Sequence, residues 1–117
     1  MKHVLIVEDN DEHAFLLQIQ LGKLGFLSSV CVNIFHILDK VQHGMIDAIT
    51  IDIGLSEING VEVIKHVRRI DKDILIIVIT SFSDESTRIH SLKSGANYHL
   101  IKPYKIEDLK TILSKVK

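Results

Sequence analysis

The chain alternates short apolar runs with longer segments of helical periodicity, and it does so five times. The runs are rich in Val and Ile and have the length of strands rather than of helices. Because they are apolar throughout, both faces of each strand must be covered. The pattern predicts a parallel sheet between two helical layers. The predicted strands are 4–7, 27–32, 48–51, 74–79 and 98–101, and the predicted helices are 9–24, 35–43, 61–70, 84–94 and 106–116.

The number of units decides between the two common forms of such a fold. Five strand–helix units in 117 residues are too few for a closed eightfold barrel. We therefore predict one α/β domain, residues 1–117, with an open, doubly wound, five-stranded parallel sheet. In such sheets ligands bind at the carboxyl ends of the strands.

Composition excludes several classes of protein. With 14 Lys and Arg against 15 Asp and Glu, the chain has no basic excess for binding nucleic acid. The longest apolar run, 74–79, is far too short to cross a membrane, and no signal peptide is recognised. The single Cys31 rules out an internal disulfide, so we expect a cytoplasmic protein with Cys31 packed in the interior.

Reactive side chains follow four of the five predicted strands. Glu8 and Asp9 follow the first, Asp52 the third, Thr80 the fourth and Lys102 the fifth. Each has an ordinary explanation alone, as a helix cap, a turn residue or a surface charge. Together they predict a site, because the carboxyl ends of parallel strands meet at one edge.

The chemistry of this set is that of magnesium-assisted phosphoryl transfer. Clustered carboxylates repel, and a hard cation with oxygen ligands relieves that repulsion. Asp52 would be the nucleophile that forms an acyl phosphate, and Glu8 and Asp9 would hold Mg²⁺. Thr80 and Lys102 would stabilise the phosphoryl oxygens.

These residues resemble those of response-regulator receiver domains of two-component signal transduction, over essentially the whole chain. The matching segments are 4–10, 52–55 with Gly60, 79–81, and 95–96 onward to 102–104. The resemblance implies a flavodoxin-like (βα)5 fold with strand order 2-1-3-4-5. It also implies that Asp52 is the phosphoacceptor, that Asp9 ligates Mg²⁺ directly and Glu8 through water, and that the backbone carbonyl of Gly54 completes the metal site.

The same resemblance implies how the signal leaves the site. Thr80 and Lys102 would bind the phosphoryl group, and Lys102–Pro103 would be a cis peptide. His99 occupies the position where the family usually has Tyr or Phe, which turns inward when Thr80 moves. We therefore expect Thr80 and His99 to form the switch, with a pH contribution from His99. An alternative is that His99 is a partly exposed spacer.

The implied partners are a sensor histidine kinase or histidine phosphotransfer protein as donor, and a downstream protein or effector domain. The output surface would be formed by 84–94, 98–101 and 106–116. The chain would be a phosphoacceptor rather than an enzyme, with no nucleic acid or membrane contact of its own. We expect a stand-alone receiver; a receiver of a DNA-binding transcriptional regulator and an unphosphorylated interaction module are the alternatives. Phosphorylation-dependent homodimerisation remains open.

Other features are assigned more ordinary roles. Phe15 and Ile19 lie four residues apart on the first helix, and we expect them to widen its apolar stripe; the alternative is an exposed pair that contacts the phosphodonor, which docks on this helix in the family that the chain resembles. Ser83 is expected to cap the fourth helix. The seven histidines are expected on helix surfaces. A flavin or nucleotide carrier is disfavoured because the acids after the first strand would repel phosphate, and an aspartyl phosphatase because 52–54 lacks a second Asp.

Two further departures from the family concern the loops. Ser56 stands where the family often has Pro, which changes loop stiffness. Gly54 offers no side chain to direct water, and Phe82 is bulky and apolar. Together they predict modest water access and slow self-dephosphorylation.

Overall fold

The computed structural model describes residues 1–54 and 59–116, so Ser56 lies outside the described residues. The strands are β1 His3–Val7, β2 Leu27–Val30, β3 Ala48–Ile51, β4 Leu75–Thr80 and β5 Tyr98–Ile101. The helices are α1 Asp11–Lys23, α2 Ile34–Gln42, α3 Gly60–Ile70, α4 Glu85–Ser94 and α5 Ile106–Leu113. All strand pairs are parallel and the order is β2-β1-β3-β4-β5, which confirms the predicted sheet.

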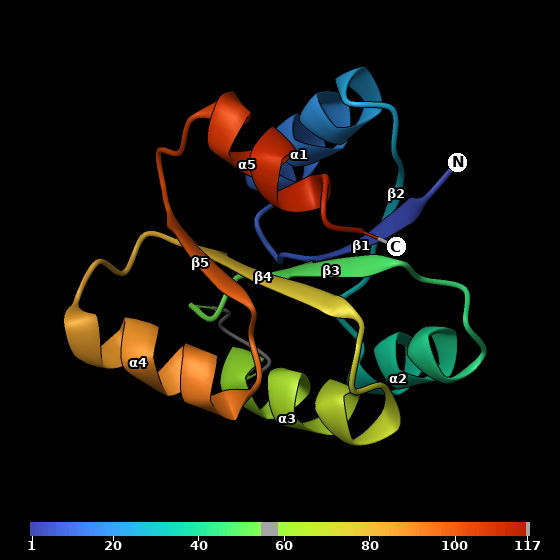
Figure 1. Ribbon diagram of the computed structural model, residues 1–117, viewed down its shortest axis with the longest axis vertical. Coiled ribbons are helices and arrows are strands. Elements are labelled where there is room, and N and C mark those ends of the chain that lie inside the picture. Colours follow the sequence, from blue (N-terminus) through green and yellow to red (C-terminus); the bar gives the residue numbers. More distant parts are fainter. Residues whose placement is uncertain (55–58, 117) are drawn as a thin grey trace.

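Two helical layers enclose the sheet (Figure 1). Helices α1 and α5 cover one face, and α2, α3 and α4 cover the other. Alternate residues of β1 show the division, since Val4 and Ile6 pack with α1 and α5 whereas Leu5 and Val7 pack with α2 and α3. Strands β3 and β4 are buried along their whole length. Burial of each large apolar side chain stabilises the fold by about 1.5–3 kcal/mol, and Thr50 and Thr80 are the polar residues buried within these two strands.

Side chains at the helix N-termini correct two sequence predictions. Asn10 caps α1 by accepting a hydrogen bond from the His13 amide, so the helix begins at Asp11 and not at Asp9. Asp84, not Ser83, caps α4, and its carboxylate accepts from the amide and hydroxyl of Thr87. A charged acceptor satisfies the free amides of a helix start better than a hydroxyl does, and it interacts favourably with the helix dipole.

The guanidinium group of Arg68 connects α3 to the segments that precede β4 and β5, at the opposite end of the sheet from Asp52. Arg68 of α3 donates to the backbone carbonyls of Ile74 and Gly95 and to the side chain of Asn97. The Asn97 oxygen also accepts from the amide of Ile76 at the start of β4. These bonds lock α3 onto the amino ends of β4 and β5. No helix in the described part of the chain is long and apolar enough to span a membrane.

Gly60 lets α3 approach the backbone that leaves the sheet after β3. It is buried at the first position of α3, and a Cβ there would lie 2.7 Å from the Cα of Ile53 and 3.2 Å from the carbonyl oxygen of Asp52. Backbone atoms at such distances cannot yield without moving the helix.

We therefore expect Gly60→Ala to lower the free energy of unfolding by about 1–3 kcal/mol, as overpacking does. The measurement is urea denaturation followed by circular dichroism. Gly22→Ala is the matched control, because a Cβ at Gly22 meets nothing within 4 Å and alanine stabilises a helix interior by about 0.5–1 kcal/mol. Equal effects from the two substitutions would show that the contact with Ile53 is unimportant.

Candidate functional site

Asp52 lies just beyond β3, at the carboxyl edge of the sheet. Its amide donates to the carbonyl of Val7 at 3.0 Å, which extends the β1–β3 pairing by one residue. Its carboxylate oxygen Oδ1 accepts from the amide of Gly54 at 2.8 Å. The side chain is 16% exposed, so the carboxylate is held in place but remains accessible.

The ammonium of Lys102 joins the ends of three elements. It donates to Glu8 Oε1 at 2.7 Å and to Asp52 Oδ2 at 3.1 Å, and it lies 2.9 Å from Nδ1 of His13. Glu8 is 6% exposed and Lys102 is 18% exposed, so this is a largely buried cluster of charges. Burial alone would lower the pKa of Lys102, but hydrogen bonds to Glu8 and Asp52 outweigh it and raise the pKa, which keeps the amine charged.

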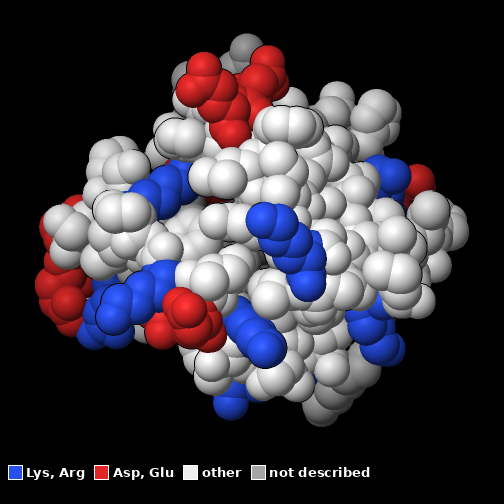
Figure 2. Space-filling view, turned by 90° about the horizontal axis from the view of Figure 1, so that it is seen from above, with Lys and Arg blue, Asp and Glu red and all other residues white. Residues whose placement is uncertain are grey.

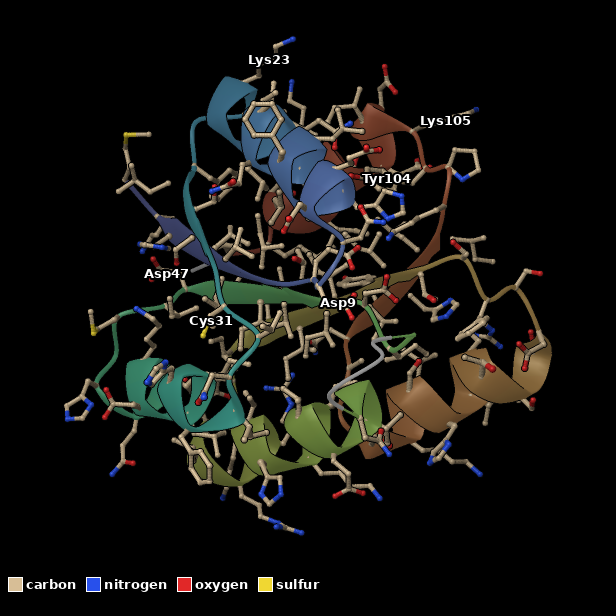
Figure 3. All side chains as sticks on the ribbon, turned by 180° about the vertical axis from the view of Figure 1, so that it is seen from behind. Asp9, Lys23, Cys31, Asp47, Tyr104 and Lys105 are labelled. Carbon is tan, nitrogen blue, oxygen red and sulfur yellow. The ribbon has the colours of Figure 1, made fainter. Side chains whose placement is uncertain are left out.

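Glu8, Asp52 and Lys102 are therefore brought together as the sequence predicted. Asp9 follows Glu8 and is exposed at the same edge. Figure 3 shows Asp9 where β1 and β3 end and Asp47 at the opposite end of the sheet. Together with His13, the cluster borders a hollow of about 20 Å³, the size of a single small group.

The fit of Mg²⁺ to this edge depends on its donors. Among the described residues no three His, Cys, Asp or Glu side chains form a ready-made metal cluster. However, Glu8 and Asp52 both direct an oxygen at one cation, the Lys102 ammonium. Carboxylate and carbonyl oxygens are what Mg²⁺ prefers, and it retains several waters rather than requiring a full protein cage. The residues present therefore suit this ion.

Phe82 and Gly54 come close beside Asp52. A Cβ on Gly54 would lie 3.1 Å from Cε2 of Phe82 and 3.3 Å from Asp52 Oδ1, although half of the Phe82 side chain is exposed. The phenyl ring thus covers the backbone next to the carboxylate. A larger residue at position 54 would push this ring away.

Thr80 is at the end of β4 and is 1% exposed. Its hydroxyl oxygen accepts from the amide of Phe82 at 3.2 Å, and its carbonyl accepts from the amide of Lys102 at 2.8 Å. The second bond places Lys102 at the end of β5, and the Lys102–Pro103 peptide is cis. Thr80 therefore connects the phenyl ring to the strand that carries the lysine.

His99 is more enclosed than the expectation of a surface histidine allowed. Both ring nitrogens are buried and have no hydrogen-bond partner within the described residues. Burial, followed by the positive charge of Arg88, lowers the pKa of His99, and Asp84 and Glu85 oppose this weakly. The imidazole is thus kept neutral between β5 and α4.

A further expectation about a surface was wrong. Phe15 and Ile19 do not widen the core stripe of α1, since 65% and 41% of these residues are exposed. Tyr98 and Tyr104 are partly buried and pack against the core beneath α1 and α5. The Tyr104 hydroxyl donates to the side chain of Gln20 on α1.

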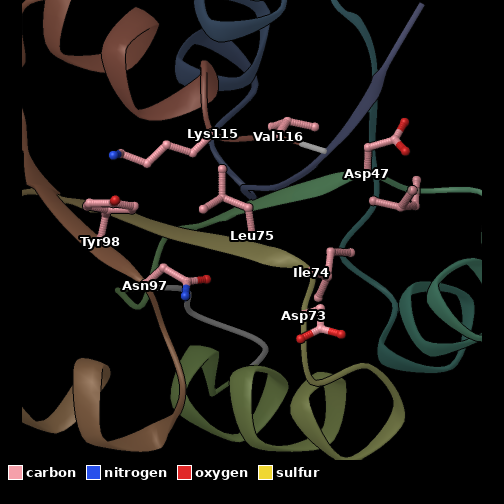
Figure 4. Close-up of a pocket in the computed structure, with 9 residues that line it drawn as sticks. Asp47, Asp73, Ile74, Leu75, Asn97, Tyr98, Lys115 and Val116 are labelled. Atoms are coloured by element: carbon pink, nitrogen blue, oxygen red, sulfur yellow. The ribbon is translucent and has the colours of Figure 1, made fainter.

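Volume alone does not locate the chemistry. A hollow of about 460 Å³ lies at the amino ends of the strands, lined in part by Asp47, Asp73 and Lys115 (Figure 4). It is at the opposite end of the sheet from Asp52. Glu8, Asp52 and Lys102 instead border the much smaller hollow of about 20 Å³.

The sequence analysis missed His13. It is half-exposed on the first turn of α1 and contacts Lys102, which is 89 residues away in sequence. No local sequence signal marks this contact, since His36 follows the capping Asn33 with the same spacing as His13 follows Asn10.

Comparison with known proteins identifies one family. The sequence matches the response regulator receiver domain over residues 4–114. Chemotaxis protein CheY of Thermotoga maritima is 29% identical and covers 98% of this chain and 97% of that protein. Transcriptional regulatory protein ZraR of Klebsiella oxytoca is 31% identical over 96% of this chain, but the chain spans only 25% of its length.

A solved structure agrees with the fold. It is the receiver domain of the sensor histidine kinase PA1611 from Pseudomonas aeruginosa PAO1, with a magnesium ion coordinated in the active site cleft. It matches with a TM-score of 0.86 at 25% identity, covering 98% of this chain and 96% of that one.

The enclosure of His99 predicts a dependence of stability on pH. Its pKa is lower in the folded protein than in the unfolded chain, so the unfolded chain binds the proton first as pH falls. The free energy of unfolding should therefore decrease as pH drops below about 6.5, the ordinary value for histidine. His99→Phe should flatten this part of the curve, measured by urea denaturation between pH 5 and about 8. An unchanged slope in His99→Phe would assign the effect to another group.

Proposed function

This chain belongs to the response regulator receiver domain family of two-component systems, and from that premise we propose that it accepts a phosphoryl group on Asp52 and signals this to a partner protein. The observation that carries the proposal is the convergence of Glu8, Asp52 and Lys102, from three separate strand ends, at hydrogen-bond distance. A stability role alone would favour apolar packing at such a buried place.

In the proposed reaction an oxygen of the Asp52 carboxylate attacks the phosphorus atom of the donor. A new oxygen–phosphorus bond forms, and the bond from phosphorus to the donor's histidine nitrogen breaks, its electron pair leaving with the nitrogen. The Gly54 amide, bound to Oδ1, restrains the carboxylate and leaves Oδ2 turned toward Lys102. That geometry favours Oδ2 as the attacking atom, since the incoming charge then develops beside the ammonium.

Lys102 and Thr80 would neutralise the phosphoryl oxygens. Lys102 is already charged and within 3.1 Å of Asp52, so it needs little reorganisation. The Thr80 hydroxyl would turn from the Phe82 amide toward the phosphoryl group, which would also release the loop after β4. The ring of His99 makes no hydrogen bond within the part of the chain that the structure describes, so it would be free to change position with that loop.

Glu8, Asp9, Asp52 and the Gly54 carbonyl are the residues that would hold Mg²⁺. When bound, the ion supplies positive charge that lowers the repulsion between the carboxylates and the incoming phosphoryl group. Lys102 supplies positive charge to the same two carboxylates, Glu8 and Asp52.

Helix α1 is the surface that we assign to the phosphodonor. Phe15, Leu16 and Ile19 are all more than 40% exposed there. Beside them a hollow of about 400 Å³ runs from Leu16 and Gln20 to Lys102, which places an apolar surface next to the site. Figure 2 shows this side of the molecule as a largely uncharged surface with scattered lysine and arginine side chains and a few groups of Asp and Glu. A helical, apolar partner would fit such a surface.

The contact between Phe82 and Gly54 supports a long-lived acyl phosphate, because the ring would hinder a water molecule attacking along that side. Output through α4, β5 and α5 remains part of the proposal. A receiver that acts by binding alone is the second candidate, because the ion pairs of Lys102 with Glu8 and Asp52 already hold the site together without a phosphoryl group.

The deciding experiment is intact mass spectrometry after incubation with Mg²⁺ and a small acyl phosphate. The wild-type protein should gain one phosphoryl group that hydroxylamine removes, and Asp52→Asn should gain none, because an amide cannot form the acyl phosphate. Asp47→Asn, which alters an acid at the opposite end of the sheet, is the control and should behave as wild type. A wild-type protein that folds but takes no label would favour the binding-only receiver.

Magnesium should stabilise the folded protein, because an ion that binds only the folded state shifts the equilibrium by mass action. At about 10 mM Mg²⁺ we expect the melting temperature to rise by about 2–5 °C, measured by scanning calorimetry at constant ionic strength. Asp9→Asn should remove most of this rise. A rise of the same size in Asp9→Asn would place the ion elsewhere.

A further inference from the structure

We infer that His13 is a positioning residue for phosphoryl transfer: it holds the ammonium of Lys102 from the exposed side of the site. This inference rests on the proposed function in so far as it assigns a consequence for the reaction. The contact itself is independent of that function, since it is a feature of the unphosphorylated protein.

The first step is the number of hydrogen bonds that Lys102 can make. An ammonium has three N–H groups and no lone pair, so it can only donate. Its nitrogen has three acceptors within 3.1 Å, namely Glu8 Oε1, Asp52 Oδ2 and His13 Nδ1. All three protons are therefore engaged, and the ammonium is fixed in direction as well as in place.

The second step is the state of the imidazole. Because Lys102 donates, Nδ1 of His13 must carry the lone pair and its proton must be on Nε2. Nδ1 also lies 3.5 Å from Glu8 Oε1, which would be an ion pair if Nδ1 carried a proton. A proton on Nδ1 of His13 would point at the ammonium protons of Lys102, and the two would repel. The shorter contact, 2.9 Å to a charged donor, decides in favour of the acceptor form.

The third step concerns the direction of the restraint. In the proposed reaction Asp52 changes charge and Glu8 would also help to hold Mg²⁺, whereas His13 is half-exposed and takes part in neither step. His13 is thus the one of the three acceptors that keeps its character while the phosphoryl group arrives. Without it, the ammonium would donate to water at the open side and would spend less time directed at Asp52. Small errors in such positions lower reaction rates strongly.

The test uses volume-matched and acceptor-matched substitutions. His13→Leu fills similar space without an acceptor, and His13→Asn restores an oxygen at the position of Nδ1. His36→Leu is the control for surface effects, because His36 is also exposed and follows the capping Asn33 by three residues, as His13 follows Asn10.

At saturating Mg²⁺ we expect His13→Leu to take label from the small acyl phosphate about threefold to tenfold more slowly than wild type, the loss expected when one hydrogen bond of ordinary net strength is exchanged for water at a half-exposed position. His13→Asn should recover to within about twofold, a rescue that a merely structural role would not show. His36→Leu should match wild type, and the rise in melting temperature with Mg²⁺ should be alike in all four proteins. Wild-type rates in His13→Leu, or no recovery in His13→Asn, would overturn the inference.

A second readout separates this inference from the proposed function. In ¹⁵N-labelled, unphosphorylated protein at neutral pH, long-range proton–nitrogen NMR should show His13 with a bare Nδ1 and a protonated Nε2. A proton on Nδ1 would refute the contact whatever the labelling shows. If wild type takes no label but His13 has the expected tautomer, the proposed function fails while the His13–Lys102 bond stands; the role in phosphoryl transfer is then overturned.

Discussion

The structure depends on the burial of three central strands on both faces. Because nearly all residues of β1, β3 and β4 are apolar and buried, helices must return the chain across one face or the other after every strand. Each return makes the next strand parallel to the last. The consequence is functional: all carboxyl ends point to one edge, so residues as distant in sequence as Glu8 and Lys102 can meet there.

At that edge the chain buries charged side chains that would be too unfavourable in its apolar interior. Glu8 is almost fully buried, and a carboxylate in such a place is tolerated only with a partner. Lys102 supplies the partner for both Glu8 and Asp52, and its own raised pKa reflects their combined effect. The cluster has two carboxylates and one ammonium, which leaves it negative and able to attract a further cation. The ion pairs that allow these charges to be buried in the folded protein thus also suit phosphoryl transfer.

Access to the site is divided among the neighbouring elements. On one side α1 presents exposed apolar residues and His13, and on the other Phe82 lies over Gly54. Thr80 lies between Lys102 and Phe82, since its carbonyl accepts from the Lys102 amide and its hydroxyl accepts from the Phe82 amide. A change at Asp52 would therefore reach the loop after β4 and the enclosed His99 through short, bonded steps. The opposite end of the sheet, locked by Arg68, has no part in this path.

The sequence by itself determined the ten elements and the presence of reactive side chains at the strand ends, because periodicity and strand-end position are local properties of the chain. The order of the strands came from the family resemblance, since periodicity does not say which strands are neighbours. Only the tertiary structure decided which groups touch: that His13 completes the bonds of Lys102, that His99 is enclosed, that Phe82 meets Gly54, and that Phe15 and Ile19 face outward. Each of these depends on packing between elements far apart in sequence, where side-chain direction and distance are set by the helices and strands on either side.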